Sequence, residues 1–403
     1  MPITLDDLPA KLTPPGPPGK RRWVVITLLC AALGSGLVVL FWPAHLQRGS
    51  LWYWCCVAVL PATVGLLSLA LRGLMYERQR DYAQRWNQQR LDHLHRLTQQ
   101  GQRAVGLLAS AYCTPAGSRQ LAGALRRGSA PLQPVYLGAS RGVSRCSQLV
   151  PVAQQHTANE YQQRLRCFMR QVLATLQQDL DQVTRLGRLR VRIRHDSTLP
   201  DAALLAAWRA CVTHDAQREE VHFATQDDGL LWLDEWLDTP GGAGAVLSLE
   251  INVFKHPVDT QCESVSAVLL ALPEFCDKHA LEPQAWVHRP AMMLEGGSPW
   301  SAVMRWGRME DPSETYFIWQ LQLCTDQLAS MNLEMAKAGR TIDRQQCLHL
   351  DGVLGRPAEA VGNIGIIVAG EQAVTDAQPQ LVVIQDQTVH GVVVRPVARR
   401  QGE

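Results

Sequence analysis

Two long stretches of the chain contain no charged residue. The first runs from Trp23 to Trp42 and the second from Leu51 to Leu71, and each is long enough to cross a hydrocarbon core of ~30 Å as a helix. The pattern therefore predicts two transmembrane helices. Neither stretch contains Asp, Glu, Lys, Arg or His, which argues against a transporter or a proton path and indicates that the spans serve as an anchor.

The short segment between the two stretches predicts a tight turn at the membrane surface. Pro43 and Gly49 interrupt the helical pattern there. Aromatic side chains that favour the headgroup layer gather on both sides of the turn: Trp42, Trp52, Tyr53 and Trp54. We expect a helical hairpin.

Basic residues are concentrated on the outer flanks of the hairpin. Lys20, Arg21 and Arg22 precede the first span, five arginines between residues 72 and 90 follow the second, and Arg48 alone lies between them. The positive-inside rule then predicts a multi-pass membrane protein with both the N-terminus and the C-terminal domain in the cytoplasm. A cleaved signal peptide is the alternative for the first span, but its apolar region exceeds the usual length of about 7–15 residues.

The remainder of the chain divides into segments of different pattern. Residues 73–106 have apolar positions at helical spacing and predict a stalk helix that continues the second span, whereas residues 107–153 are rich in Gly, Ser, Ala and Arg and indicate a linker or small subdomain. The expected parts are a cytoplasmic tail (1–22), the hairpin (23–72), the stalk (73–106), the linker (107–153), a cytosolic α/β domain (154–397) and a tail (398–403).

The α/β assignment rests on alternating short runs after an amphipathic helix expected at residues 158–186. Strand, helix, strand, helix and strand are predicted at 189–193, 200–212, 220–223, 229–237 and 245–254. Such a βαβαβ unit buries a mainly parallel sheet under helices. We further expect helices at 263–272 and 314–338, and strands at 347–350, 364–368, 381–384 and 390–394.

Composition and motifs exclude several functions. The 403 residues carry 39 basic and 37 acidic side chains, and the net charge of +2 gives no global field that would attract nucleic acid. The sequence has neither an HExxH motif nor paired CxxC motifs, and it lacks a P-loop, a GxSxG elbow and a GxGxxG fingerprint. We therefore expect no metal, no cofactor and no nucleic-acid partner.

Cys262 is the main candidate for chemistry. The string VDTQCESVSAVLLAL places it at the start of the helix expected over residues 263–272, where the helix dipole would stabilise a thiolate. The string resembles the nucleophile motif of the ketoacyl-synthase branch of the thiolase-like superfamily, Asp-Thr-Ala-Cys-Ser-Ser, with matches at Asp259, Thr260, Cys262 and Ser264. The alternative interpretation is that Cys262 is a small residue packed in the core.

Two later strings resemble the motifs that supply catalytic histidines in that family. In LHLDGVLGRPAEA, Asp351 followed by Gly352 stands in place of the first histidine, with His349 two residues earlier. In VGNIGIIVAG, the matching Asn363 and Gly365 are followed by Ile366 in place of the second. The resemblance implies a thiolase-like layered fold that lacks the donors for decarboxylation and carbonyl polarisation, so no catalytic residue is favoured.

The two spans, the Arg-rich stalk and the degenerate α/β domain together resemble membrane-anchored accessory proteins encoded with bacterial type VI secretion spike and effector genes. This resemblance implies a non-enzymatic adaptor or chaperone-like protein of the bacterial inner membrane that recruits a secreted effector or a spike protein. Membrane lipid is a further expected partner, because the arginines of the stalk near the bilayer can contact anionic lipid. Two alternatives are an acyl-transferring condensing enzyme that uses Cys262 and His349, and a structural membrane component that oligomerises through its spans and stalk.

Overall fold

The computed structural model describes residues 8–17, 19–43, 47–136, 142–212, 219–224, 226–239, 241–293, 299–340 and 343–397. The chain divides into two compact units, one within residues 4–97 and the other within residues 98–403.

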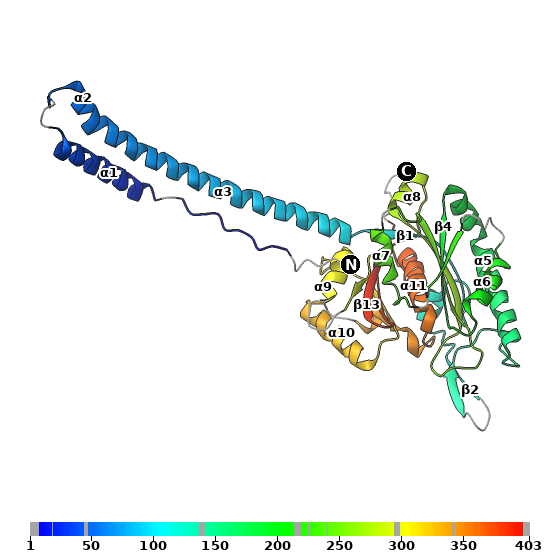
Figure 1. Cartoon of the computed structure of the whole chain (residues 1–403). Helices are drawn as coiled ribbons and strands as arrows, with labels where there is room; N and C mark the ends of the chain where they lie inside the picture. Colours follow the sequence, from blue (N-terminus) through cyan, green and yellow to red (C-terminus); the bar gives the residue numbers. More distant parts are fainter. Residues whose placement is uncertain are drawn as a thin grey trace, which may run out of the picture. The chain divides into compact units, whose positions relative to one another are not determined.

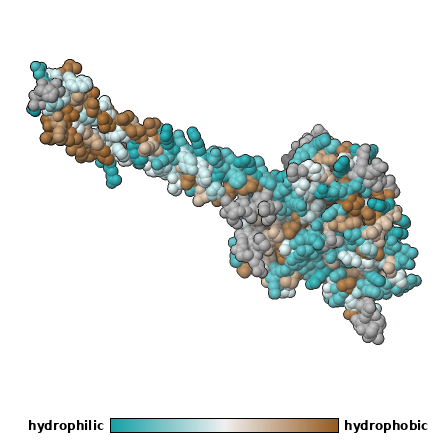
Figure 2. All heavy atoms as spheres, viewed as in Figure 1, coloured by the Kyte–Doolittle hydropathy of each residue, from teal (hydrophilic) through white to brown (hydrophobic). Residues whose placement is uncertain are grey.

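The first unit contains the two apolar stretches as helices. Helix α1 (Lys20–Phe41) holds the first stretch, and α2 (Leu51–Trp54), a π-helical turn (Cys55–Val59) and α3 (Leu60–Gly101) form one run that begins with the second. Both are long and apolar enough to cross a membrane, and Figure 2 shows apolar side chains giving way to polar ones along α3. The expected continuation of the second span as a helix is present, and it ends at Gly101.

Small residues allow the two helices to pack closely. A side chain at Gly34 would lie 2.8 Å from Pro61, and one at Gly65 would lie 2.9 Å from Thr27. The Ser35 hydroxyl also donates a hydrogen bond across the pair to a backbone carbonyl, at 2.6 Å. The two apolar stretches therefore form the antiparallel hairpin that their pattern predicts.

The segment before α1 lies along the part of α3 that follows the second span (Figure 1). The Asn87 side chain accepts a hydrogen bond from the backbone N–H of Leu12 at 3.0 Å and donates one to its carbonyl at 2.8 Å. Arg90 donates to the carbonyl of Pro9 at 2.7 Å. Because these contacts join residues outside both apolar stretches, the two flanks of the hairpin lie on the same side of it.

The second unit is built on one large mixed sheet. Its strands are β1 (Ala104–Cys113), β4 (Leu189–His195), β5 (Glu219–Phe223), β6 (Ala245–Asn252), β7 (Ser264–Ala271), β8 (Ala285–His288), β9 (Ala291–Met292), β10 (Phe317–Leu321), β11 (Cys347–His349), β12 (Gln380–Gln385) and β13 (Val389–Pro396). They follow the order β11-β10-β12-β13-β8-β1-β7-β6-β4-β5, with β9 paired to β13. Strands β2 (Gln133–Tyr136) and β3 (Val143–Cys146) form a separate hairpin.

The two ends of the sheet are parallel and its middle is antiparallel. At one end β4 pairs in parallel with β5 and β6, connected through α6 (Asp201–Arg209) and α7 (Trp232–Asp238), which confirms the predicted βαβαβ unit. At the other end β10 pairs in parallel with β11 and β12, connected through α10 (Thr325–Lys337) and α11 (Val361–Asp376). The α/β class is thus confirmed.

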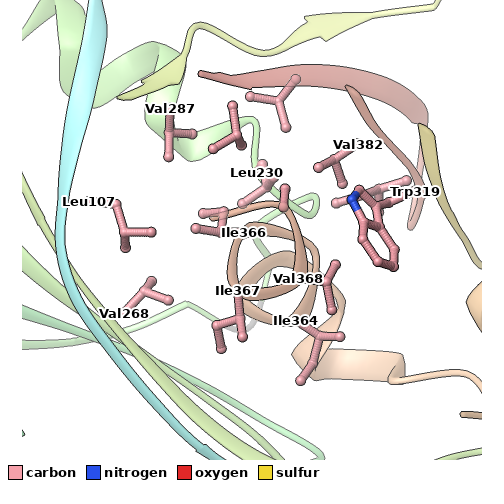
Figure 3. Packing of buried hydrophobic residues seen from close by; sticks show 14 of the residues in the cluster. Leu107, Leu230, Val268, Val287, Trp319, Ile364, Ile366, Ile367, Val368 and Val382 are labelled. Atoms are coloured by element: carbon pink, nitrogen blue, oxygen red, sulfur yellow. The ribbon is translucent and has the colours of Figure 1, made fainter. Parts of the chain in front are cut away.

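Helices lie in three layers against the sheet. Helix α5 (Ala158–Leu186), α6 and α8 (Pro273–His279) pack on one outer face, and α9 (Pro299–Trp306) and α10 pack on the outer face of the other half. Helix α11, with α4 (Leu121–Arg126) beside it, lies between the two halves. Figure 3 shows Ile364, Ile366, Ile367 and Val368 of α11 among side chains from strands on several sides.

Two expected elements are of the opposite type. Residues 263–272 are not a helix but strand β7, and residues 364–368 are not a strand but part of helix α11. Every residue of β7 is buried, and so are twelve of the sixteen residues of α11. An element buried on all sides has no polar face, so its apolar run does not show whether its period is 2 or 3.6.

The expected domain boundaries are also wrong in one respect. Residues 107–153 are not only a linker or a small subdomain, because β1 lies inside the main sheet between β7 and β8. The expected helix at 314–338 is in fact strand β10 followed by α10. The main sheet thus includes strand β1, which begins at Ala104, well before the expected domain start at residue 154.

Candidate functional site

Cys262 lies in an extended segment between two other chain segments. Its backbone N–H donates to the carbonyl of Arg356 at 2.9 Å, and it forms a parallel bridge with Ser147. Strand β7 begins two residues later. The expectation that Cys262 starts a helix is therefore wrong.

The surroundings of the Cys262 thiol disfavour the thiolate. The residue is fully buried, and its Sγ donates to the carbonyl of Glu263 at 3.1 Å. Burial raises the pKa of Cys262 well above its usual value, and the neighbouring Glu263 and Cys146 raise it further. A reactive cysteine needs the reverse, an accessible thiol beside a positive group.

The matching residues beside Cys262 have structural partners. Asp259 accepts hydrogen bonds from the backbone N–H of Arg145 at 2.9 Å and from the Ser144 hydroxyl at 3.1 Å, and these bonds lower its pKa. The backbone N–H of Thr260 donates to the carbonyl of Arg145 at 2.6 Å. Asp259 and Thr260 thus attach strand β3 to the Cys262 segment, while Ser264 is fully buried at the start of β7.

Asp351 and Gly352 lie in a short 3-10 helix, Leu350–Gly352. Burial raises the pKa of Asp351, which accepts from the backbone N–H of Gln322 at 2.9 Å. Its second oxygen lies 3.8 Å from His349 and 3.5 Å from Arg356. His349 therefore lies beside Asp351.

The structure does bring the segment after Asp351 to the Cys262 segment. Gly355 has a φ of +95°, and a side chain there would lie 3.0 Å from the backbone of Gln261. The backbone N–H of Arg356 also donates to the carbonyl of Thr260 at 2.8 Å. The two strings that resemble family motifs are therefore neighbours, and they meet through backbone atoms.

Asn363 and Gly365 lie in the first turns of α11. The Asn363 amide is fully buried and donates to the carbonyls of Ser248 and Ser266 at 2.8 and 3.1 Å. A side chain at Gly365 would lie 2.9 Å from Val382. Ile366, the next residue after Gly365, is fully buried in the core.

A buried charged network was not predicted from the sequence. Arg192 and Arg194 of β4 are each 3 % exposed. Arg192 contacts Asp227 at 2.7 Å and Glu250 at 2.9 Å. Arg194 has two carboxylate partners, Glu359 at 2.7 Å and Asp386 at 2.6 Å. The signal is visible in LRVRIRH, where arginines alternate with apolar residues and so share one face of a strand.

The network joins the two halves of the sheet, and both Glu250 and His390 have partners in it. Glu250 is fully buried, and one of its oxygens accepts the backbone N–H of Asn363 at 2.7 Å. His390 is also fully buried, and burial lowers its pKa. Its Nε2 accepts the backbone N–H of Leu230 at 3.1 Å. These partners indicate a structural network.

Comparison with solved structures shows the fold. A ketosynthase of a type II polyketide synthase, solved in complex with its acyl-carrier protein, superimposes with a TM-score of 0.51 at 9% identity over 73% of this chain and 100% of that one. The fold is thiolase-like. The ketosynthase of module 6 of the bacillaene synthase from Bacillus subtilis 168 gives 0.52 at 7% identity, over 74% of this chain and 71% of that one.

A third match is the ishigamide ketosynthase/chain length factor, with a TM-score of 0.51 at 13% identity over 74% of this chain and 100% of that one. No protein-family model matches the chain, and no curated protein sequence matches it. At these identities the likeness shows the thiolase-like fold alone.

Proposed function

We propose that this chain is a non-enzymatic adaptor, anchored in the bacterial inner membrane, that recruits a protein partner such as a secreted effector or a spike protein of a type VI secretion system. Its thiolase-like domain would serve as a binding scaffold. The observation that carries the non-enzymatic part is Cys262, which is fully buried with a raised pKa. The two apolar helices that could cross a membrane support the anchor.

The enzyme alternative requires Cys262 to act as a nucleophile with a histidine as base. His349 lies beside Asp351, and Ile366 occupies the position of the second family histidine. Loss of a single oxyanion donor commonly lowers the rate by ~10²–10³. The ketosynthase likeness alone does not outweigh these features, because a fold hosts many functions.

We expect Cys262 to react slowly with iodoacetamide near neutral pH, because its thiol is buried and protonated. The exposed Cys167 on α5 should react rapidly in the same sample. Mass spectrometry of the digested full chain measures both rates. The chain should also accept no acyl group from malonyl or acyl thioesters.

The Cys262→Ala variant tests the same proposal through binding. We expect the variant and the original chain to co-purify with the same proteins from detergent, as identified by mass spectrometry. Rapid labelling of Cys262, or loss of partners at an unchanged melting temperature, would favour the condensing enzyme.

The proposed location predicts a cytoplasmic domain. Alkaline phosphatase fused after Gly101, at the end of α3, should be inactive because the enzyme requires an oxidising compartment for its disulfides. A fusion at Gly49, between the two apolar stretches, is the matched control and should be active. The reverse pattern would place the domain on the other side of the membrane.

A further inference from the structure

A groove of about 920 Å³ opens between α4 and the C-terminal half of α11. None of the residues that resemble family motifs lines it, so it is separate from the Cys262 segment. Ala122 and Gly123 of α4 form part of one wall, and Val374 of α11, whose side chain is 53% exposed, forms part of the other.

Gln372 has a side-chain amide that forms no hydrogen bond with the described residues. Its side chain is only 4% exposed, and it lines the groove. The amide atoms are not completely enclosed by the protein. A buried amide normally has partners, so this one is available to a bound molecule.

The acidic groups of the groove are already paired. Glu371 accepts hydrogen bonds from the Tyr112 hydroxyl and from the backbone N–H of Ala122 at 2.9 Å. Asp376 forms an ion pair with Arg126 at 2.8 Å, and the Arg126 guanidinium also lies over the Phe317 ring at 4.7 Å. Arg126 thus balances the charge of Asp376, and the two hydrogen bonds occupy both oxygens of Glu371.

Arg127 is the charged group of the groove that has no partner among the described residues. Its guanidinium lies over Gly123, where a methyl group would come within 3.2 Å of Nη1. The groove therefore presents one unpaired positive charge beside an unpaired amide and an exposed apolar side chain. This combination is complementary to a segment that carries a carboxylate, a peptide group and an apolar side chain.

We infer that the groove between α4 and α11 binds an extended acidic segment of a partner protein. The Gln372 amide can both donate to and accept from a peptide group, the Arg127 guanidinium pairs with an Asp or Glu side chain, and Val374 contacts an apolar side chain of the segment. The inference rests on the proposed adaptor function, and it names the surface and the chemistry of the partner.

The test uses the full chain in nanodiscs of phosphatidylcholine and two fluorescein-labelled heptapeptides. One alternates valine with aspartate, and the other alternates valine with lysine. Fluorescence anisotropy should show that the aspartate peptide binds at least about tenfold more tightly than the lysine peptide. Arg127→Glu should weaken the binding of the aspartate peptide by about tenfold and strengthen the binding of the lysine peptide. Val374→Lys should weaken the binding of the lysine peptide.

The matched control is Arg209→Glu, which changes an exposed arginine in the last turn of α6 and should leave both affinities unchanged. Equal binding of the two peptides, or equal effects of Arg127→Glu and Arg209→Glu, would overturn the inference. Acyl transfer through Cys262 would instead overturn the proposed function and would not alter these peptide affinities.

Discussion

A fragment that begins at Thr98 should fold, whereas a fragment that begins at Gln154 should aggregate. The second fragment lacks β1, which pairs with β7 on one side and with β8 on the other. Its side chains include Val105 and Leu107, at 0% and 1% exposure, and burying each contributes about 1.5–3 kcal/mol. The free energy lost when the whole strand is removed is thus more than a domain with a total stability of about 5–15 kcal/mol tolerates.

Circular dichroism and analytical gel filtration of the two fragments measure this difference. The Thr98 fragment should be monodisperse and unfold cooperatively, and the Gln154 fragment should elute in the void volume or lack a melting transition. A folded Gln154 fragment would show that β7 and β8 can join directly. It would restore the domain boundary that the sequence suggested.

The variant Glu263→Ala should lower the melting temperature by roughly 10 °C. The Glu263 carboxylate is fully buried and pairs with Arg164 at 2.8 and 3.0 Å. It also accepts the backbone N–H groups of Leu149 and Phe254, both at 2.7 Å. Its loss leaves a buried guanidinium unpaired, which costs about 3–5 kcal/mol, and each kcal/mol corresponds to about 2–4 °C in a large domain.

Thermal unfolding of the full chain in detergent, followed by circular dichroism, measures the shift. The matched control is Glu220→Ala, because Glu220 is 74% exposed and lies 3.9 Å from Arg190, so its loss should cost less than about 1 kcal/mol. The double variant Arg164→Met with Glu263→Leu should recover part of the loss, because it removes both charges. Equal shifts for Glu263→Ala and Glu220→Ala would contradict the structural role of the pair.

Local pattern was a reliable guide where an element has one polar and one apolar face. Helix α5 was predicted at residues 158–186 and has those bounds, because a surface helix shows its period directly. The βαβαβ unit from β4 to β6 was predicted from the alternation of its short runs, although every residue of β6 is buried. The errors fall on β7 and α11, which are buried on every side.

The candidate site was predictable in part. The sequence singled out Cys262 and the two later strings, and the structure places the Cys262 segment against Gly355 and Arg356. It did not reveal that Cys262 is enclosed, because burial depends on three segments that are far apart in the chain. The carboxylate partners of Arg192 and Arg194 were equally hidden, although the alternation of LRVRIRH was visible.

The sequence by itself determined the two apolar stretches, the charge on their flanks, the α/β class and the presence of Asp351 and Ile366, rather than histidines, in the two strings that resemble family motifs. Each of these depends on residue type and on spacing within a short window. Only the tertiary structure decided that β1 belongs to the main sheet, that the Cys262 thiol is buried, and that Gln372 and Arg127 share an open groove with no partner in the described chain. These properties arise from contacts between distant segments, and those contacts decide which groups lose water and which find a partner.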